Sequence, residues 1–135
     1  MFFATRARCL LVVLWIAFPA YGNDVEIVGA DFQRQQDGSW TINVALLHAD
    51  DGWGHYADLW RLVDSEGNVL GERKLLHPHD DEQPFARSTS GVRIPKDSTA
   101  LFLEAHDSVH GWSPNRLAVD ITQAEDGRLR VLPEH

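Results

Sequence analysis

Six of the seven histidines in this chain lie in three stretches of sequence that also carry several aspartates and glutamates. These histidines are His48, His55, His77, His79, His106 and His110. Neutral imidazole nitrogens and carboxylate oxygens are ligands that Zn²⁺ and Cu²⁺ accept in proteins. The residue types therefore indicate a divalent transition metal, copper or zinc, as the ion that these stretches would hold.

The sharpest local signal is His77-Pro78-His79, which is followed by three acidic residues at 80–82. Pro78 favours an extended conformation at His77, and residues i and i+2 of an extended segment point the same way. Both rings of this segment are therefore expected to address one ion.

We expect histidines from different loops to meet at this ion, with nearby acids as further ligands or as hydrogen-bond acceptors. The predicted metal residues are His55, His77, His79, His110, Asp51, Glu82 and Asp107. Two histidines have simpler roles open to them: His48 as a cap on the core at a strand end, and His106 as a solvated surface residue beside Glu104.

The elements that must position these residues are short segments rich in β-branched and aromatic residues, separated by turn signals such as Asp37-Gly38. We expect seven strands near 24–33, 40–48, 55–63, 69–76, 87–94, 99–106 and 116–121. This pattern predicts an all-β antiparallel sandwich of the immunoglobulin or fibronectin type III kind.

Alternation along two of these strands predicts the core. The core set is Trp40, Ile42, Val44, Leu46, Leu101 and Leu103. His48 ends the first alternating series on its core face, and Asp107 is next in line on the core face of the second.

Successive antiparallel strands reverse direction, so the connections alternate between the two ends of the sandwich. The connections 49–54, 77–86 and 107–115 therefore fall at one end and carry the histidines there. Long loops on a rigid sandwich commonly carry binding residues.

The N-terminus has the pattern of a signal peptide. Arg6 and Arg8 precede the apolar run at 10–18, and Ala20-Tyr21-Gly22 supplies small residues before a cleavage site. The run is too short to span a bilayer, which needs roughly 20 apolar residues. We expect a periplasmic or secreted protein with no stable membrane association after cleavage.

This pattern divides the chain into a signal peptide at 1–22, a sandwich domain at 23–122 and a C-terminal extension or tail at 123–135. Cys9 is the only cysteine and precedes the apolar run, so we expect neither lipidation nor a disulfide. Residues 23–135 hold 10 basic and 20 acidic residues. That balance argues against nucleic acid as a partner, and no protein partner is indicated.

Two other functions compete with that of a metal-binding domain. A small-molecule or glycan-binding module would use the loop aromatics Trp53, Tyr56 and Trp112. A metal-dependent hydrolase would need a base such as Glu82 or Asp51. The chain has no Gly-x-Ser-x-Gly, phosphate loop or His-Glu-x-x-His motif, so a binding protein is favoured over an enzyme.

Three strings together resemble a family of small exported bacterial proteins of unestablished function. The strings are Trp53-x-His55-Tyr56-Ala57-Asp58, Leu76-His77-Pro78-His79-x-x-Glu82-Gln83-Pro84-Phe85 and His106-Asp107-Ser108-Val109-His110-Gly111. The resemblance covers about residues 40–121 and implies the same fold and site, but no particular chemistry. A likeness to cupins at Gly71, His77 and His79 is set aside, because the gap to Glu82 is too short and the second glycine-rich motif is absent.

Overall fold

The computed structural model describes residues 24–134, and the signal peptide expected at 1–22 lies outside this part of the chain. The described residues form nine strands and one short 3-10 helix. The strands are β1 (Glu26–Arg34), β2 (Trp40–Leu47), β3 (Ala57–Asp64), β4 (Val69–Lys74), β5 (Phe85–Val92), β6 (Ala100–Asp107), β7 (Gly111–Trp112), β8 (Leu117–Asp120) and β9 (Arg128–Val131). The helix, η1 (Ile121–Gln123), follows β8.

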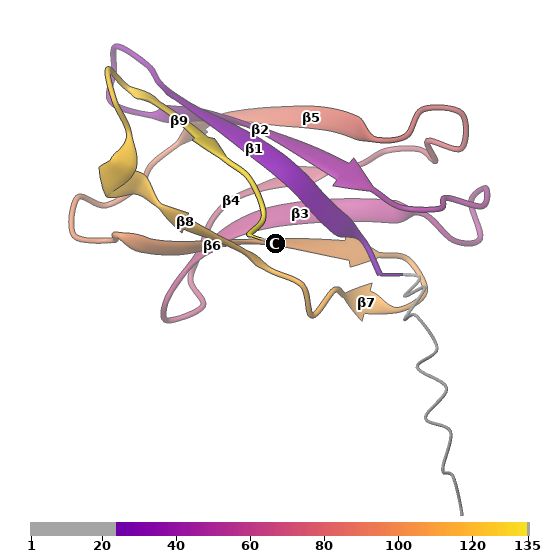
Figure 1. Cartoon of the computed structure of the whole chain (residues 1–135). Coiled ribbons are helices and arrows are strands. Elements are labelled where there is room, and N and C mark those ends of the chain that lie inside the picture. Colours follow the sequence, from indigo (N-terminus) through magenta and orange to yellow (C-terminus); the bar gives the residue numbers. More distant parts are fainter. Residues whose placement is uncertain (1–23, 135) are drawn as a thin grey trace, which may run out of the picture.

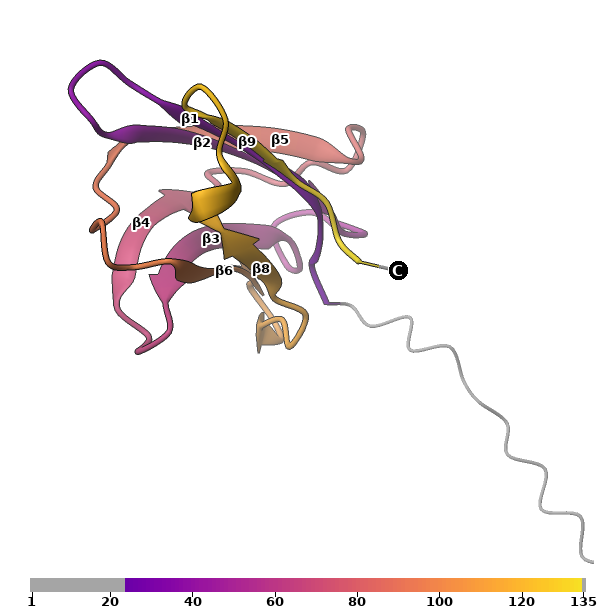
Figure 2. The ribbon, with the colours of Figure 1, turned by 60° about the vertical axis from the view of Figure 1, so that its left-hand side comes forward.

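The strands form two antiparallel sheets that face each other (Figures 1 and 2). One sheet has the order β5-β2-β1-β9, and the other has the order β4-β3-β6-β7, with β8 also paired to β6. The predicted antiparallel β-sandwich is therefore confirmed. None of the helices among residues 24–134 is long and apolar enough to cross a membrane.

The core lies between the sheets and follows the alternation of the strands. The predicted core residues Trp40, Ile42, Val44, Leu46, Leu101 and Leu103 are all buried. Trp60, Phe32 and Phe85 add the largest buried side chains. Because successive side chains of a strand point to opposite faces, buried residues alternate with half-buried ones along most of β2 and β6.

Two short strands, β7 and β9, are present in addition to the seven strands that the sequence predicts. Residues 128–131, within the segment expected to be an extension or tail, form β9 and pair with β1 from Ala30 to Gln33. Leu129 and Val131 pack against the core, whereas Arg128 and Arg130 face solvent. The sequence of β9 is a weak strand signal, because it is only four residues long and two of them are arginines. Hydrogen bonds to β1 stabilise the strand.

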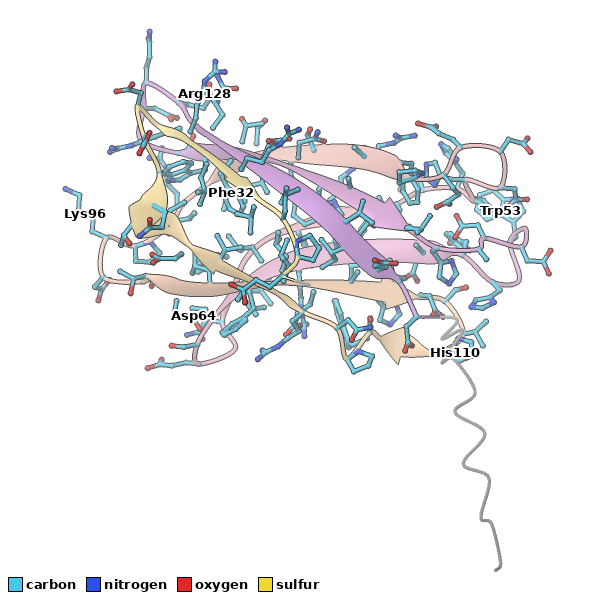
Figure 3. The ribbon with its side chains drawn as sticks, in the orientation of Figure 1. Phe32, Trp53, Asp64, Lys96, His110 and Arg128 are labelled. Atoms are coloured by element: carbon cyan, nitrogen blue, oxygen red, sulfur yellow. The ribbon has the colours of Figure 1, made fainter. Side chains whose placement is uncertain are left out.

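Three connections that carry histidines meet at one end of the sandwich. We call this end the histidine pole and define it by the connections at 48–56, 75–84 and 108–110. Trp53 and His110 lie at this end in Figure 3, and Asp64, Lys96 and Arg128 lie at the other. The alternation of connections thus predicts correctly which loops are neighbours.

Candidate metal centre

Asp107 is the last residue of β6, and its side chain lies on the core face at the rim of the sandwich. Only 1% of that side chain is exposed. Its Oδ1 accepts hydrogen bonds from the backbone N–H groups of Val109 (2.8 Å) and His110 (2.6 Å). Burial by itself would raise the pKa of Asp107, but these two N–H donors and the imidazoles of His110 and His55 outweigh it and lower the pKa below its ordinary value. Asp107 is therefore a buried carboxylate that stays ionised.

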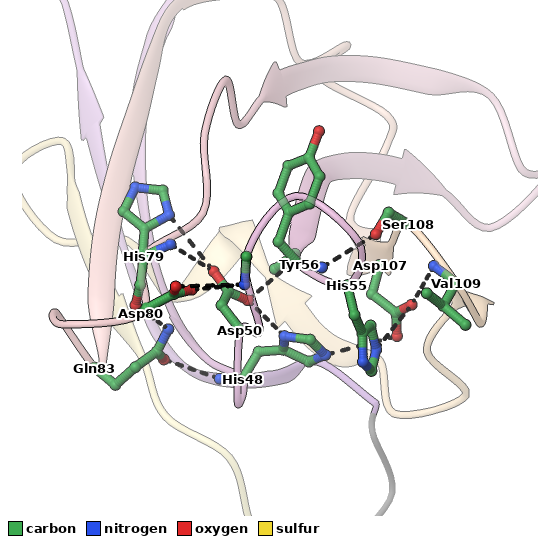
Figure 4. A network of polar contacts seen from close by, with 12 residues as sticks. His48, Asp50, His55, Tyr56, His79, Asp80, Gln83, Asp107, Ser108 and Val109 are labelled. Atoms are coloured by element: carbon green, nitrogen blue, oxygen red, sulfur yellow. Dashed lines mark hydrogen bonds and ion pairs between the residues drawn. The ribbon is translucent and has the colours of Figure 1, made fainter.

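Three imidazoles surround the carboxylate of Asp107. His55 Nε2 lies 3.5 Å from Oδ1, while His48 Nε2 lies 3.7 Å and His110 Nδ1 lies 3.3 Å from Oδ2. The ring centroids of His48 and His55 are 4.9 Å apart, as are those of His55 and His110. Potential ligand atoms of His48, His55 and Asp107 all lie within 4.8 Å of one another. Figure 4 shows these three side chains pointing toward a common centre.

His48 follows β2 and is oriented by a second carboxylate. Its Nδ1 lies 2.6 Å from Oδ1 of Asp50, and the side chains of both residues are buried. An ionised carboxylate can only accept, so in neutral His48 the proton is assigned to Nδ1. This tautomer leaves Nε2, which faces Asp107, as the nitrogen that can bind a metal.

Asp50 also holds the surrounding backbone. Its Oδ1 accepts from the N–H of Ala57 (2.9 Å), and its Oδ2 accepts from the N–H of His79 (2.8 Å). One carboxylate with no exposed side-chain surface thus joins the end of β2, the start of β3 and the connection between β4 and β5. The position of the His48 ring depends on all three elements.

His55 carries an unsatisfied nitrogen in this centre. Its Nε2 atom is buried and has no hydrogen-bond partner among the described residues. A buried polar atom without a partner costs about 1–3 kcal/mol. The atom lies beside an ionised carboxylate and other imidazoles, so a bound cation would provide the missing partner.

The residues predicted as metal ligands fall into three groups. His55, His110 and Asp107 meet in this centre, where His48 joins them. The rings of His77 and His79 lie 4.5 Å apart and border a different pocket, beside Arg73 and Arg87. Asp51 and Glu82 are exposed.

Two members of the network are not among the residues that the sequence predicts as metal ligands. The sequence leaves open for His48 the simpler role of a cap on the core, and it does not indicate Asp50. The signal for His48 was its place at the end of an inward-facing series, the same position that Asp107 has on β6. No feature of the local sequence distinguishes Asp50 from its neighbour Asp51, which is exposed.

The loop aromatics form separate contacts. Trp53 is 69% exposed and packs edge to face with Tyr56 at 5.7 Å between centroids. The guanidinium of Arg61 lies 3.6 Å above the ring of Trp112, and His106 contacts that ring while pairing with Asp58. Arg61 therefore covers a face of Trp112, which weakens the case for that ring as a ligand platform.

The chain is similar to a protein of Halomicrobium mukohataei that is named "Putative lipoprotein". The two are 32% identical over 111 residues, which cover 82% of this chain. Those residues make up 53% of the relative, so the chain spans about half the length of the curated relative that it matches. No family model matches the chain, and no solved structure matches it.

Proposed function

We propose that this chain is an exported binding domain that holds one divalent transition metal ion, Cu²⁺ or Zn²⁺, at the histidine pole. His48, His55 and Asp107 are the ligands, and His110 is the fourth. The observation that carries the proposal is the approach of potential ligand atoms of the first three residues to within 4.8 Å of one another.

The distances suit the size of such an ion. Ligands placed tetrahedrally at about 2.0–2.1 Å from zinc are roughly 3.3 Å apart. The three imidazole nitrogens lie 3.3, 3.5 and 3.7 Å from an oxygen of Asp107. Small side-chain rotations would therefore bring these atoms to coordination distance.

The donor set favours a borderline metal over a hard one. Ca²⁺ and Mg²⁺ take oxygen ligands, whereas imidazole nitrogen suits Zn²⁺ and Cu²⁺. The contact between Asp50 and Nδ1 of His48 matches the carboxylate that commonly orients a metal-bound histidine. The net charge of −8 adds a field that attracts cations.

Two observations support export: the signal pattern of residues 1–22, and the name of the relative, which describes a lipoprotein. We propose a periplasmic or secreted location. Lipid attachment is not part of the proposal, because the only cysteine, Cys9, precedes the apolar run. His77, His79, Asp51 and Glu82 are likewise outside the proposed ligand set, since the first two border Arg73 and Arg87.

The test is calorimetric titration of residues 23–135, stripped of metal, with Zn²⁺ and with Cu²⁺. The parent is expected to bind one ion per chain, and His55→Ala to weaken binding at least tenfold. His55 is the variant of choice because its ring carries no backbone hydrogen bond in the described residues, whereas Asp107 holds the turn after β6. Protons compete with the metal for the imidazole nitrogens, so binding should also weaken as the pH falls.

Two controls separate this site from other histidines. His106→Ala removes an imidazole that pairs with Asp58 on the outer face, and it should bind metal like the parent. The double variant His77→Ala/His79→Ala should also retain binding. A parent that binds neither ion, or a His55→Ala variant that binds as tightly as the parent, would contradict the proposal.

A further inference from the structure

A second pocket lies beside the histidine pole, on the side where β4 of one sheet approaches β5 of the other. Its volume is about 70 Å³. It is lined by Arg73, Leu75, Leu76, His77, His79 and Arg87. In a chain of net charge −8, these lining residues include two arginines and two histidines but no carboxylate.

Arg73 reaches this pocket from the inner face of β4. It pairs in register with Trp60, which is fully buried, so the two side chains share the inward face. Its Nη1 donates to the backbone carbonyl of Ser88 on β5 (3.0 Å). Its Nε is buried and has no hydrogen-bond partner within residues 24–134.

His79 supplies a second unsatisfied group. Its ring stacks on Phe85 with centroids 3.8 Å apart and planes 9° apart, and its backbone N–H donates to Asp50. Both ring nitrogens are buried, and in the described chain neither has a hydrogen-bond partner. Burial first, and then the charges of Arg87 and His77, lower the pKa of His79, against the opposing charges of Asp50 and Glu82. The carboxylate of Asp50 lies on one side of the ring, with its Oδ2 3.8 Å from Nδ1.

Arg87 is only weakly neutralised. Its Nη2 lies 3.6 Å from Oε2 of Glu82, whose side chain is 61% exposed. An exposed ion pair of this kind contributes about 0–1 kcal/mol and exchanges readily. The guanidinium is therefore able to accept a second anionic partner from the pocket.

We propose that this pocket binds an oxyanion group, a phosphate or a carboxylate, through Arg73 and Arg87, with the ring of His79 as a further contact. Guanidinium groups present paired N–H donors that match the spacing of two oxygens on such a group. A pocket of about 70 Å³ holds one group of this size. The ligand is thus either a small free anion or the anionic end of a larger molecule.

This inference does not depend on the proposed metal. The two sites share no ligand, although Asp50 contacts both His48 and His79. Binding of an anion to metal-free protein would support the pocket whether or not the metal proposal holds.

The experiment is a titration of metal-free residues 23–135 with inorganic phosphate and, separately, with acetate, in chloride buffer. Two-dimensional ¹H–¹⁵N spectra report the backbone signals of residues 73–87. We expect saturable shifts with at least one of the two anions, and the stronger binder identifies the class of group. Arg87→Gln should weaken this binding at least tenfold, and Arg73→Gln serves as a second variant if the first fails to fold.

Arg93→Gln is the matched control. It removes the same charge at the residue that follows β5, but Arg93 pairs with Asp37 at the opposite end of the sandwich. It should bind as the parent does. The proposal would be overturned if neither anion gave saturable shifts. It would also be overturned if Arg93→Gln weakened anion binding as much as the pocket variants do, or if both pocket variants bound the anion as the parent does.

Discussion

The imidazole of His48 and the carboxylate of Asp50 form a buried pair, with 2.6 Å between Nδ1 and Oδ1. The same carboxylate accepts hydrogen bonds from the backbone N–H groups of Ala57 and His79, so it has three hydrogen-bond partners in all. Burial of a charge is costly unless such partners replace water. The pair therefore holds the ring of His48 in place, and Asp50 also links the two connections of the histidine pole at 48–56 and 75–84.

Asp50→Asn is expected to lower the free energy of unfolding by on the order of 2–4 kcal/mol, because the amide cannot accept all three hydrogen bonds. Asp51→Asn makes the same chemical change at the exposed neighbour and should stay within about 0.5 kcal/mol of the parent. Urea unfolding measures both. Equal effects at the two positions would show that Asp50 does not organise the pole.

Leu103→Ala is expected to destabilise the domain by on the order of 2–4 kcal/mol, through lost burial and the cavity left behind. Leu103 is fully buried between the sheets, whereas Leu132 is 63% exposed. Leu132→Ala therefore serves as the control and should have little effect. Thermal or urea unfolding of both variants checks the placement of the core.

His79→Phe is expected to make the domain less sensitive to acid. The pKa of His79 is lowered in the folded state, so below the ordinary value of about 6.5 the unfolded chain binds the proton more readily. The contribution of this group to stability is therefore present above that value and is lost as the pH falls toward the folded-state pKa. Phenylalanine keeps the stacking on Phe85 and removes two buried nitrogens that have no hydrogen-bond partner among residues 24–134.

The measurement for this variant is the free energy of unfolding from pH 8 to pH 5 in chloride buffer. The parent should lose stability below pH 6.5 more steeply than His79→Phe does. Identical pH profiles for the two proteins would contradict the assigned direction of the pKa.

Strand β9 is expected to protect its backbone from hydrogen exchange. Residues 128–131 pair with β1, and Leu129 and Val131 pack on the core. Their hydrogen-bonded amides should exchange more slowly than those of the exposed turn at 65–68, as mass spectrometry or NMR would show. Exchange as fast as in that turn would indicate that this segment is a tail after all.

The sequence by itself determined the sandwich, its main strands and its core. Inward-facing series such as Trp40 to Leu46 and Leu101 to Leu103 are visible because side-chain direction in a strand alternates with every residue. The same alternation placed Asp107 on the core face, and the reversal of antiparallel strands placed the three histidine loops at one end. These are local properties or simple consequences of chain direction.

Only the tertiary structure decided which side chains meet. It brought His48 to Asp107, buried Asp50 but not Asp51, and set His79 against Phe85 beside Arg73 and Arg87. It also paired residues 128–131 with β1, about a hundred positions earlier in the chain. The reason is physical: loop conformation and edge pairing depend on contacts between residues far apart in sequence, and no local pattern of residue types encodes those contacts.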